Sequence, residues 1–295
     1  MARIDAMTLL DFQQRFSNEQ ACEEYLFSQK WPSGFKCPDC QHTKYYFVQT
    51  RRIYECRKCG HQTSLTAGTM LHRSKLPLLK WFWAIYLVVH DKRGRSALSI
   101  ADLLKINYRT AWRLLHKIRH SMCTRDAKYV LSGLVEMDDA YFGAPQKGSD
   151  GRGTTKAKVI IALSTDESGN PKFIRMKVAS RISKEEIQRV ALNCVKPGST
   201  VTSDGLNCYQ VLKEIGYDHH YKDYYKENEE FLKWLHIVIS NAKAFILGTY
   251  HGLSKKYLQS YLDEYCYRFN RRHRPNELFC RLLNACIVTG HYKVS

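Results

Sequence analysis

Four cysteines are the residues whose type and spacing point most directly to chemistry. They form two C-x2-C pairs, Cys37 with Cys40 and Cys56 with Cys59, and fifteen residues separate the pairs. Each pair can form a turn that directs both sulfurs toward one ion, and four thiolates satisfy the tetrahedral preference of Zn²⁺. We predict a structural zinc site, because four protein ligands leave no open position for a substrate. A redox dithiol is the alternative, although that chemistry needs only one pair.

Two aspartates that follow apolar runs form the second candidate group. Asp138 lies in the run that begins at Leu134, and Asp204 follows Val201-Thr202-Ser203 and precedes Gly205. Carboxylates at the ends of neighbouring strands can share a divalent metal ion, which phosphoryl transfer uses to activate the attacking oxygen and stabilise the leaving one. Each motif alone is weak, because an Asp-Gly pair after a strand is more often a turn.

Four stretches of different composition must position these groups. Residues 1–30 show helical spacing and predict two short helices, and residues 31–70 alternate Gly, Pro, Cys and aromatic residues, which predicts the short strands of a zinc ribbon. Residues 71–128 return to a helical pattern, and residues 129–295 alternate strands with helices before a mostly helical end. The sequence therefore predicts a multidomain α+β and α/β protein.

The elements expected in the last two domains follow from hydrophobic periodicity. Acidic residues lie at the ends of the first and last expected strands, where open α/β sheets hold their ligands. We predict helices at 77–91, 97–105, 108–122 and 184–192, and strands at 134–141, 157–164, 172–178 and 200–203.

The charge of the chain indicates its partner. Lys and Arg total 46 against 28 Asp and Glu, a formal net charge of +18, and this sign attracts nucleic acid. The apolar stretch 81–89 is too short to cross a bilayer, so no membrane association is expected. Residues 1–30 lack the apolar core of a signal peptide, so we expect a cytoplasmic protein.

Residues 99–115 have the pattern of a helix-turn-helix, in which a short helix precedes a second helix with basic residues at its start. We predict that Tyr108, Arg109 and Arg113 reach base edges, and that Lys117 and Arg119 contact phosphates. The alternative is that the apolar residues of the second helix form an ordinary core stripe and that its charges are solvated.

Over nearly its full length, the chain resembles the zinc-ribbon insertion-sequence transposases of the DDE class, whose catalytic domain has the ribonuclease H-like fold. The resemblance implies a helix-turn-helix-like reader ahead of a ribonuclease H-like catalytic domain with C-terminal helices. Its residues are the two cysteine pairs, 62–69, 135–139, 202–205, 248–251 and 267–272.

The resemblance implies that Asp138 and Asp204 are the first two ligands of a catalytic divalent ion. Asp139 is the alternate, although strand alternation directs its side chain to the other face of the sheet. Many DDE transposases carry a helical Glu with a Lys seven residues later, and the matching pair here is His236 and Lys243. Both share one helix face, whereas the alternative ligand, Asn241, does not share it with Lys243.

This ligand set has consequences for the metal and for the DNA. Some branches of the family replace the third acid by His or Asn, and an imidazole ligand suits Mn²⁺ better than Mg²⁺, which prefers oxygen. The resemblance places Lys243 at the phosphate near the scissile bond. Arg271 and Arg272 lie in a segment that interleaves aromatic residues with cations, a pattern typical of strand-gripping segments. A solvated helix end is the alternative for that segment.

The sequence as a whole predicts an enzyme that binds the terminal inverted repeats of an insertion sequence. It would cleave double-stranded DNA and join the ends to a target, first with water and then with a DNA 3′-hydroxyl as the nucleophile, and at least two copies would act together. One alternative is a catalytically inactive, domesticated or decayed DNA-binding relative, in which His236 merely packs on its helix. A ribonuclease that acts on hybrids would share the fold without needing the helix-turn-helix.

Overall fold

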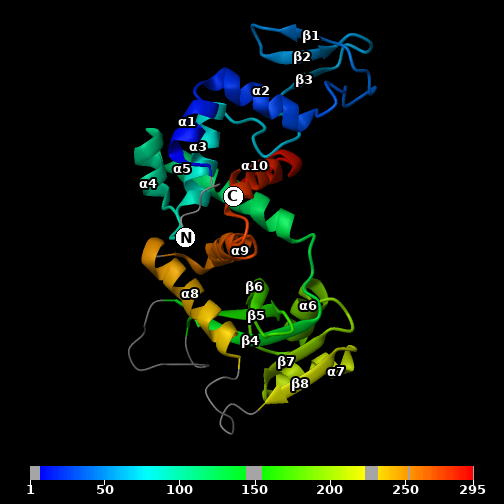
Figure 1. Cartoon of the computed structure of the whole chain (residues 1–295), viewed down its shortest axis with the longest axis vertical. Helices are drawn as coiled ribbons and strands as arrows, with labels where there is room; N and C mark the ends of the chain where they lie inside the picture. The colour runs from blue at the N-terminus through cyan, green and yellow to red at the C-terminus, as the bar shows by residue number, and fades with distance from the viewer. Residues whose placement is uncertain (1–6, 144–154, 223–231, 252, 295) are drawn as a thin grey trace. The chain divides into compact units, whose positions relative to one another are not determined.

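The computed structural model describes residues 7–143, 155–222, 232–251 and 253–294 (Figure 1). The chain divides into two compact units, Met1–Arg125 with Arg274–Ser295, and Asp126–His273. The first unit holds the N-terminal helices and the cysteine pairs, and the second holds the candidate carboxylates. Among the described residues, no helix is both long and apolar enough to cross a bilayer.

Helices make up most of the first unit, and the sequence predicted most of them. The two short helices expected before residue 30 are confirmed as α1 (Leu9–Arg15) and α2 (Glu19–Lys30). The three expected between 77 and 122 are α3 (Leu78–His90), α4 (Ala97–Leu104) and α5 (Tyr108–Asp126). Local capping explains the starts of the first two, because Thr8 and Asp11 form a capping box and Asn18 accepts the amide of Ala21.

The start of α3 is fixed by a residue from another helix. Pro77, at its N-cap, offers no side-chain acceptor. The Glu19 carboxylate of α2 instead accepts the backbone amides of Leu78 and Leu79 at 2.7 and 2.9 Å. A carboxylate is favourable at this end of a helix, because the exposed amides carry partial positive charge.

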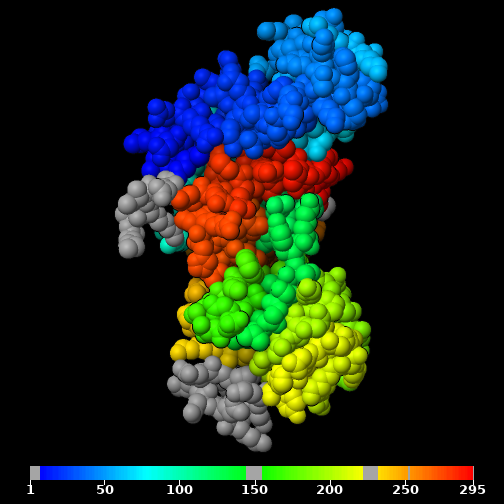
Figure 2. All heavy atoms as spheres, turned by 45° about the vertical axis from the view of Figure 1, so that its right-hand side comes forward, coloured from blue at the N-terminus to red at the C-terminus, as the bar shows by residue number. Residues whose placement is uncertain are grey.

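The C-terminal helix, α10 (Leu278–Val288), packs in the first unit. Phe279 lies against Phe12 and Phe16, with ring centroids 5.5 and 5.4 Å apart, and the amide of Met70 donates to the carbonyl of Cys286 at 2.9 Å. Figure 2 shows this red segment against the blue N-terminal one. The predicted catalytic domain runs from residue 129 to residue 295, but the second unit ends at His273. The apolar face of α10 instead completes the aromatic core of the N-terminal helices.

The zinc ribbon is a three-stranded antiparallel sheet in the order β1-β2-β3. Its strands are β1 (Tyr45–Val48), β2 (Ile53–Cys56) and β3 (Gln62–Ser64). The ammonium of Lys30, at the end of α2, donates to the carbonyls of Ser64, Leu65 and Ala67 at 3.1, 2.9 and 2.7 Å. These bonds join the ribbon to α2, and burial lowers the pKa of Lys30 to about 8.

The second unit is built on a five-stranded mixed sheet in the order β6-β5-β4-β7-β8. β5 pairs antiparallel with β4 and β6, whereas β7 pairs parallel with β4 and β8. The four predicted strands are confirmed, and β8 was not predicted. The strands are β4 (Leu134–Phe142), β5 (Ala157–Thr165), β6 (Pro171–Ala179), β7 (Thr200–Asp204) and β8 (Asp218–Lys222).

Helices cover both faces of this sheet, each over its own apolar cluster. Ala140 and Phe142 of β4 belong to the cluster that includes α8 (Lys233–Thr249) and α9 (Leu258–Phe269). Val135 and Met137 belong to the other cluster, with α6 (Lys184–Cys194) and α7 (Val211–Glu214). This mixed sheet with its helices resembles the ribonuclease H-like core that the sequence resemblance implied. Short 3-10 turns lie at Asn207–Gln210, Lys255–Tyr257 and Pro275–Glu277.

Asn270, at the end of α9, fastens that helix to the edge of the sheet. Its side-chain oxygen accepts the amide of Ile174 at 2.7 Å, and its side-chain nitrogen donates to the carbonyl of Ile174 at 3.1 Å. The same nitrogen donates to Asp126 at 3.2 Å. The side chain thus satisfies backbone groups of β6 as a neighbouring strand would.

We predict that Asn270→Ala lowers the free energy of unfolding of the second unit by about 2–4 kcal/mol, because it leaves both backbone groups of Ile174 without this partner. Urea unfolding followed by circular dichroism measures the change. Asn193→Ala is the control, since Asn193 is exposed and makes one bond, to the carbonyl of Arg189. Equal unfolding midpoints for the two variants would contradict this role of Asn270.

Candidate functional site

The four cysteines converge as the sequence predicted. Their sulfur atoms all lie within 4.8 Å of one another, with Cys37 3.7 Å from Cys59 and Cys40 3.5 Å from Cys56. Ligands about 2.3 Å from a tetrahedral zinc ion are separated by roughly 3.8 Å, so these spacings fit the ion. Among the described residues, this is the one group of three or more His, Cys, Asp or Glu side chains close enough to share a metal.

Two equivalent turns hold these sulfurs. In the first, the amide of Gln41 donates to the carbonyl of Cys37 at 3.1 Å, and in the second, the amide of Gly60 donates to Cys56 at 3.0 Å. Gln41 and Gly60 adopt positive φ angles of 62° and 70°, which Gly accommodates without strain. Burial opposes ionisation of Cys56, but the Cys59 and Lys58 amides and the neighbouring thiols outweigh it and lower its pKa to about 7. Thiolates are the form that binds metal.

The register of the sheet places Asp138 and Asp204 side by side. β4 and β7 are parallel and paired from Leu134–Thr200 to Met137–Ser203, so the next residues of the two strands are the two aspartates. Both therefore point to the face that α8 covers, because Ala140, on the same side of β4, belongs to that cluster. Asp139 pairs with Ile160, which lies in the other cluster, so its side chain points to the opposite face.

α8 brings His236 to this pair. The imidazole Nε2 lies 3.3 Å from Oδ2 of Asp138, and the hydrogen bond to this carboxylate raises the pKa of His236 above its usual value. The His236 side chain is 42% exposed, so solvent and substrate can reach it. Oδ1 of Asp138 accepts the amide of Asp139 at 2.7 Å, which fixes the orientation of the carboxylate.

The side chains of Lys243 and Asn241 lie on different sides of α8. The Lys243 ammonium lies 5.9 Å from the ring centroid of Phe142, on the sheet side of the helix, and Asn241 is exposed. The structure thus brings His236, and not Asn241, to Asp138. His236, Asp138 and Asp204 do not all converge within 4.8 Å in the part of the chain that the structure describes.

Three residues that the sequence did not predict as site residues lie near Asp204: Ser203, His219 and Tyr209. Ser203 lies 2.8 Å from Nε2 of the buried His219 and donates to the carbonyl of Asp204 at 2.9 Å. Tyr209 is fully buried, and burial with the charges of Asp138, Asp139 and Asp204 raises its pKa well above the usual value. The phenol therefore stays protonated, and it lies in the apolar cluster on the opposite face of the sheet from Asp138 and Asp204. No short sequence motif marks these residues, because they lie on separate elements.

The predicted helix-turn-helix has a tight turn between α4 and α5. Lys105 closes α4 with a φ of 49°, and the amide of Ile106 donates to Ala101 at 3.0 Å. Asn107 accepts the amide of Arg109 at 2.8 Å and starts α5. The first residues of α5 that were predicted to read bases are exposed: Tyr108, Arg109 and Arg113.

The structure contradicts the phosphate contact predicted for Arg119, whose side chain is only 2% exposed. Lys117 is half-buried, donates to the carbonyl of Met70 at 3.3 Å, and lies 5.8 Å from the ring centroid of Trp81. Burial lowers the pKa of Lys117. Both cations lie on the side of α5 that faces the core, which charge alone in a sequence does not reveal.

The two arginines predicted to grip DNA after α9 have internal partners instead. Arg271 pairs with Asp126 at 2.7 Å and stacks on Tyr267, with 3.6 Å between the guanidinium and the ring centroid. Arg272 donates to the carbonyl of Lys172 at 2.8 Å and stacks on Phe269. The aromatic and cationic segment therefore stabilises the end of α9, because each cation packs on an aromatic ring of its own helix turn.

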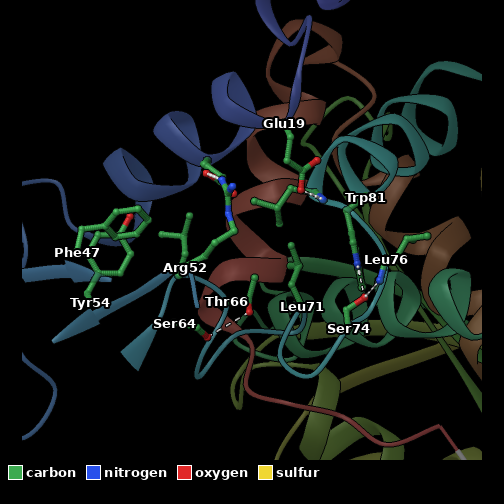
Figure 3. A pocket seen from close by; sticks show the side chains of 13 residues that line it. Glu19, Phe47, Arg52, Tyr54, Ser64, Thr66, Leu71, Ser74, Leu76 and Trp81 are labelled. Atoms are coloured by element: carbon green, nitrogen blue, oxygen red, sulfur yellow. Dashed lines mark hydrogen bonds and ion pairs between the residues drawn. The ribbon is translucent and has the colours of Figure 1, made fainter. Parts of the chain in front are cut away.

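A cavity of about 280 Å³ in the first unit offers no second catalytic group (Figure 3). Its acidic residues are engaged, since Glu19 caps α3 and Glu23 pairs with Arg52. The indole nitrogen of Trp81 donates to Ser74 at 2.9 Å. These polar groups stabilise the junction of the ribbon with the helices.

Solved structures similar to this chain include two Mos1 assemblies and a retroviral intasome. The Mos1 strand transfer complex is 11% identical with a TM-score of 0.31, and the match covers 72% of this chain and 79% of the Mos1 chain. The Mos1 mariner paired end complex with Mn has 12% identity and a TM-score of 0.29, covering 71% and 79%. The simian T-cell lymphotropic virus intasome in complex with PP2A regulatory subunit B56 gamma has 11% identity and a TM-score of 0.31, covering 61% and 66%.

Sequence comparison finds similarity to transposase proteins in two segments of the chain. A protein in transposable element ISH50 of Halobacterium salinarum is 24% identical over 218 residues, which cover 68% of this chain and 71% of that protein. Residues 130–270, which include both aspartates and His236, match the ISXO2-like transposase domain, and residues 17–62, which include the four cysteines, match the transposase zinc-ribbon domain. The chain is therefore similar to the ISXO2-like transposase domain over residues 130–270 and to a transposase zinc ribbon over residues 17–62.

Proposed function

We propose that this protein is a DNA transposase that binds the terminal inverted repeats of an insertion sequence and catalyses metal-dependent strand cleavage and strand transfer. The observation that carries the proposal is the in-register placement of Asp138 and Asp204 on one face of the sheet, with His236 of α8 3.3 Å from Asp138. Matches to transposase domains over residues 17–62 and 130–270 support it.

The donor atoms of Asp138, Asp204 and His236 are of types that bind a divalent ion. Two carboxylates and one imidazole share a face of the sheet, and His236 favours Mn²⁺ whereas the carboxylates also suit Mg²⁺. When bound, the ion would polarise the scissile phosphate and assist ionisation of the nucleophile. Asp138 and Asp204 would hold it, His236 would complete the set, and Lys243 would orient the phosphate by charge. The four cysteines would hold a separate, structural Zn²⁺.

The first unit would recognise the DNA. Tyr108, Arg109 and Arg113 are exposed at the start of α5, where a helix in the major groove presents side chains to base edges. The net charge of +18 supports binding to duplex DNA at the transposon ends and at the target. Two ends must be processed together, so we propose that at least two copies assemble on DNA.

One observation favours the alternative of an inactive DNA-binding relative. Asp204 does not come within metal-sharing distance of both Asp138 and His236 among the described residues, and no acid occupies the third position. Such a relative would keep the ribbon and the reader without cleaving DNA.

We predict that wild-type protein with Mn²⁺ cleaves a labelled duplex that carries the element's own ends, and that Asp204→Asn and His236→Ala each slow cleavage more than about 100-fold. His236→Ala removes a proposed metal donor and Asp204→Asn removes the negative charge of another, and both leave the apolar core intact. Asp218→Asn is the control, because Asp218 is exposed on the neighbouring strand β8. Wild-type protein that binds the ends tightly but never cuts them would favour the inactive relative.

We predict that the purified protein contains one zinc ion and that Cys40→Ser loses it, because three thiolates hold zinc less tightly than four. Elemental analysis measures the metal, and urea unfolding measures the loss of ribbon stability. Cys123→Ser, on α5 outside the cluster, should keep the zinc. Full zinc content in the Cys40 variant would rule out the four-cysteine site.

We predict that Arg109→Ala and Arg113→Ala each weaken binding to the element's ends by about 1–3 kcal/mol relative to unrelated duplex. Fluorescence anisotropy at fixed salt measures both affinities. Arg189→Ala, an exposed arginine on α6, is the control and should leave the preference unchanged. If the arginine variants lose no preference, α5 does not read the ends.

A further inference from the structure

A second cavity, of about 340 Å³, lies in the second unit where β4 and β5 end beneath α8 and α9. Its inner wall is apolar and consists of four buried side chains, those of Phe142, Ala157, Ile246 and Leu258. Phe142 and Ala157 are the last pair of residues between the two strands. A cavity of this size with an apolar lining is typical of a site for one small, flat group, and a DNA duplex could not enter it.

Basic residues surround the opening of this cavity. Lys156, His251 and Lys255 line it, and the last two are exposed. The Lys255 ammonium donates to the carbonyl of Thr155, which keeps this cation at the opening. Among the lining residues that the structure describes, none is acidic. An apolar interior with a basic opening complements a ligand that joins an apolar ring to an anion, as a nucleotide does.

The cavity lies close to the candidate carboxylate site and on the same face of the sheet. Asp138 and Phe142 are four residues apart on β4, so about 13 Å separate them along the strand. Lys243 lies near this path, with its ammonium 5.9 Å from the ring centroid of Phe142. A stacked DNA strand advances by about 3.4 Å per nucleotide. A DNA strand with one phosphate at Asp138 would therefore pass the cavity within about four nucleotides.

We propose that this cavity binds one unpaired nucleobase of the transposon end, taken out of the duplex within about four nucleotides of the scissile phosphate, while Lys156 and Lys255 contact the DNA backbone. The inference rests on the proposed function, since the cavity and the carboxylate site would hold the same DNA. A base that enters the cavity must leave its stack and its pairing partner. This cost is smallest for a base that is already mispaired, and the test uses that difference.

A mismatch scan measures whether a base leaves the duplex. Duplexes with the element's own ends carry a single mismatch at one of about four positions on either side of the cleavage site, the range that the strand geometry allows. Fluorescence anisotropy without Mn²⁺ or Mg²⁺ measures the Kd of the uncut DNA. At one position the mismatch should tighten binding about 10-fold, because base pairing no longer opposes extrusion. Equal affinity at every position would overturn the inference.

The variant Leu247→Glu tests whether the extruded base enters this cavity. Leu247 lines the cavity and is 44% exposed, so a carboxylate there opposes the binding of DNA without disturbing the core. This variant should bind matched and mismatched duplexes equally. Leu192→Glu is the matched control, because Leu192 is 53% exposed on α6, does not line the cavity and receives the same charge. A mismatch effect that persists in Leu247→Glu would overturn the inference.

Abasic sites test whether the cavity binds the base itself. Removal of the base opposite the extruded one should tighten binding as the mismatch does, since extrusion then breaks no pair. Removal of the extruded base should weaken binding about 5-fold or more relative to that duplex, because the contacts of the base with protein side chains are lost. Equal affinity of the two abasic duplexes would contradict binding of a base in the cavity.

The outcomes separate this inference from the proposed function. If wild-type protein cuts the element's ends but no mismatch changes its affinity, the inference is wrong and the transposase proposal stands. If wild-type protein neither prefers these ends nor cuts them, the proposed function fails and the inference fails with it.

Discussion

In-register pairing of β4 with β7 is the constraint on which the candidate site depends. Side chains alternate between the faces of a strand, so a slip of one residue would turn either Asp138 or Asp204 into the opposite apolar cluster. β5 fixes this register from the other side of β4, because it is buried along nearly its whole length and pairs with β4 from Leu134–Thr165 to Phe142–Ala157. Packing of the apolar core therefore determines how Asp138 and Asp204 are placed relative to each other.

The helices add a second layer of constraint. α8 carries His236 and Lys243 two turns apart, so one helix orientation directs both to the sheet side, near Asp138 and Phe142 respectively. α9 is fixed by Asn270, which bonds to the backbone of β6. The cations near this end of α9 also stabilise the second unit, since Arg271 forms an ion pair with Asp126. Some basic residues of this chain are therefore exposed to solvent, whereas others have partners inside the fold.

The sequence could predict what short-range periodicity specifies. The N-terminal helices, the ribbon strands, the three helices up to α5 and four strands of the second sheet were all predictable, because each carries its own apolar pattern. β8 was not, since Asp218-His219-His220-Tyr221-Lys222 offers no apolar alternation and only His219 among its described side chains is buried. The pattern of α10 predicted a helix but could not show which core it completes. The burial of Arg119 depends on tertiary packing, which the sequence pattern does not show.

The residue type at the proposed third position determines the charge of the candidate site. Three acids would offer a divalent ion three negative charges, whereas Asp138, Asp204 and a neutral His236 offer two. Glu136 places another carboxyl on the same face of β4, where burial raises its pKa and the charge of His236 opposes that shift. An acid on this face adds negative charge near the candidate site without lying at the proposed ligand position itself. With His236 as the proposed third donor, α8 supplies the imidazole and the sheet supplies three acidic side chains on the same face, those of Asp138, Asp204 and Glu136.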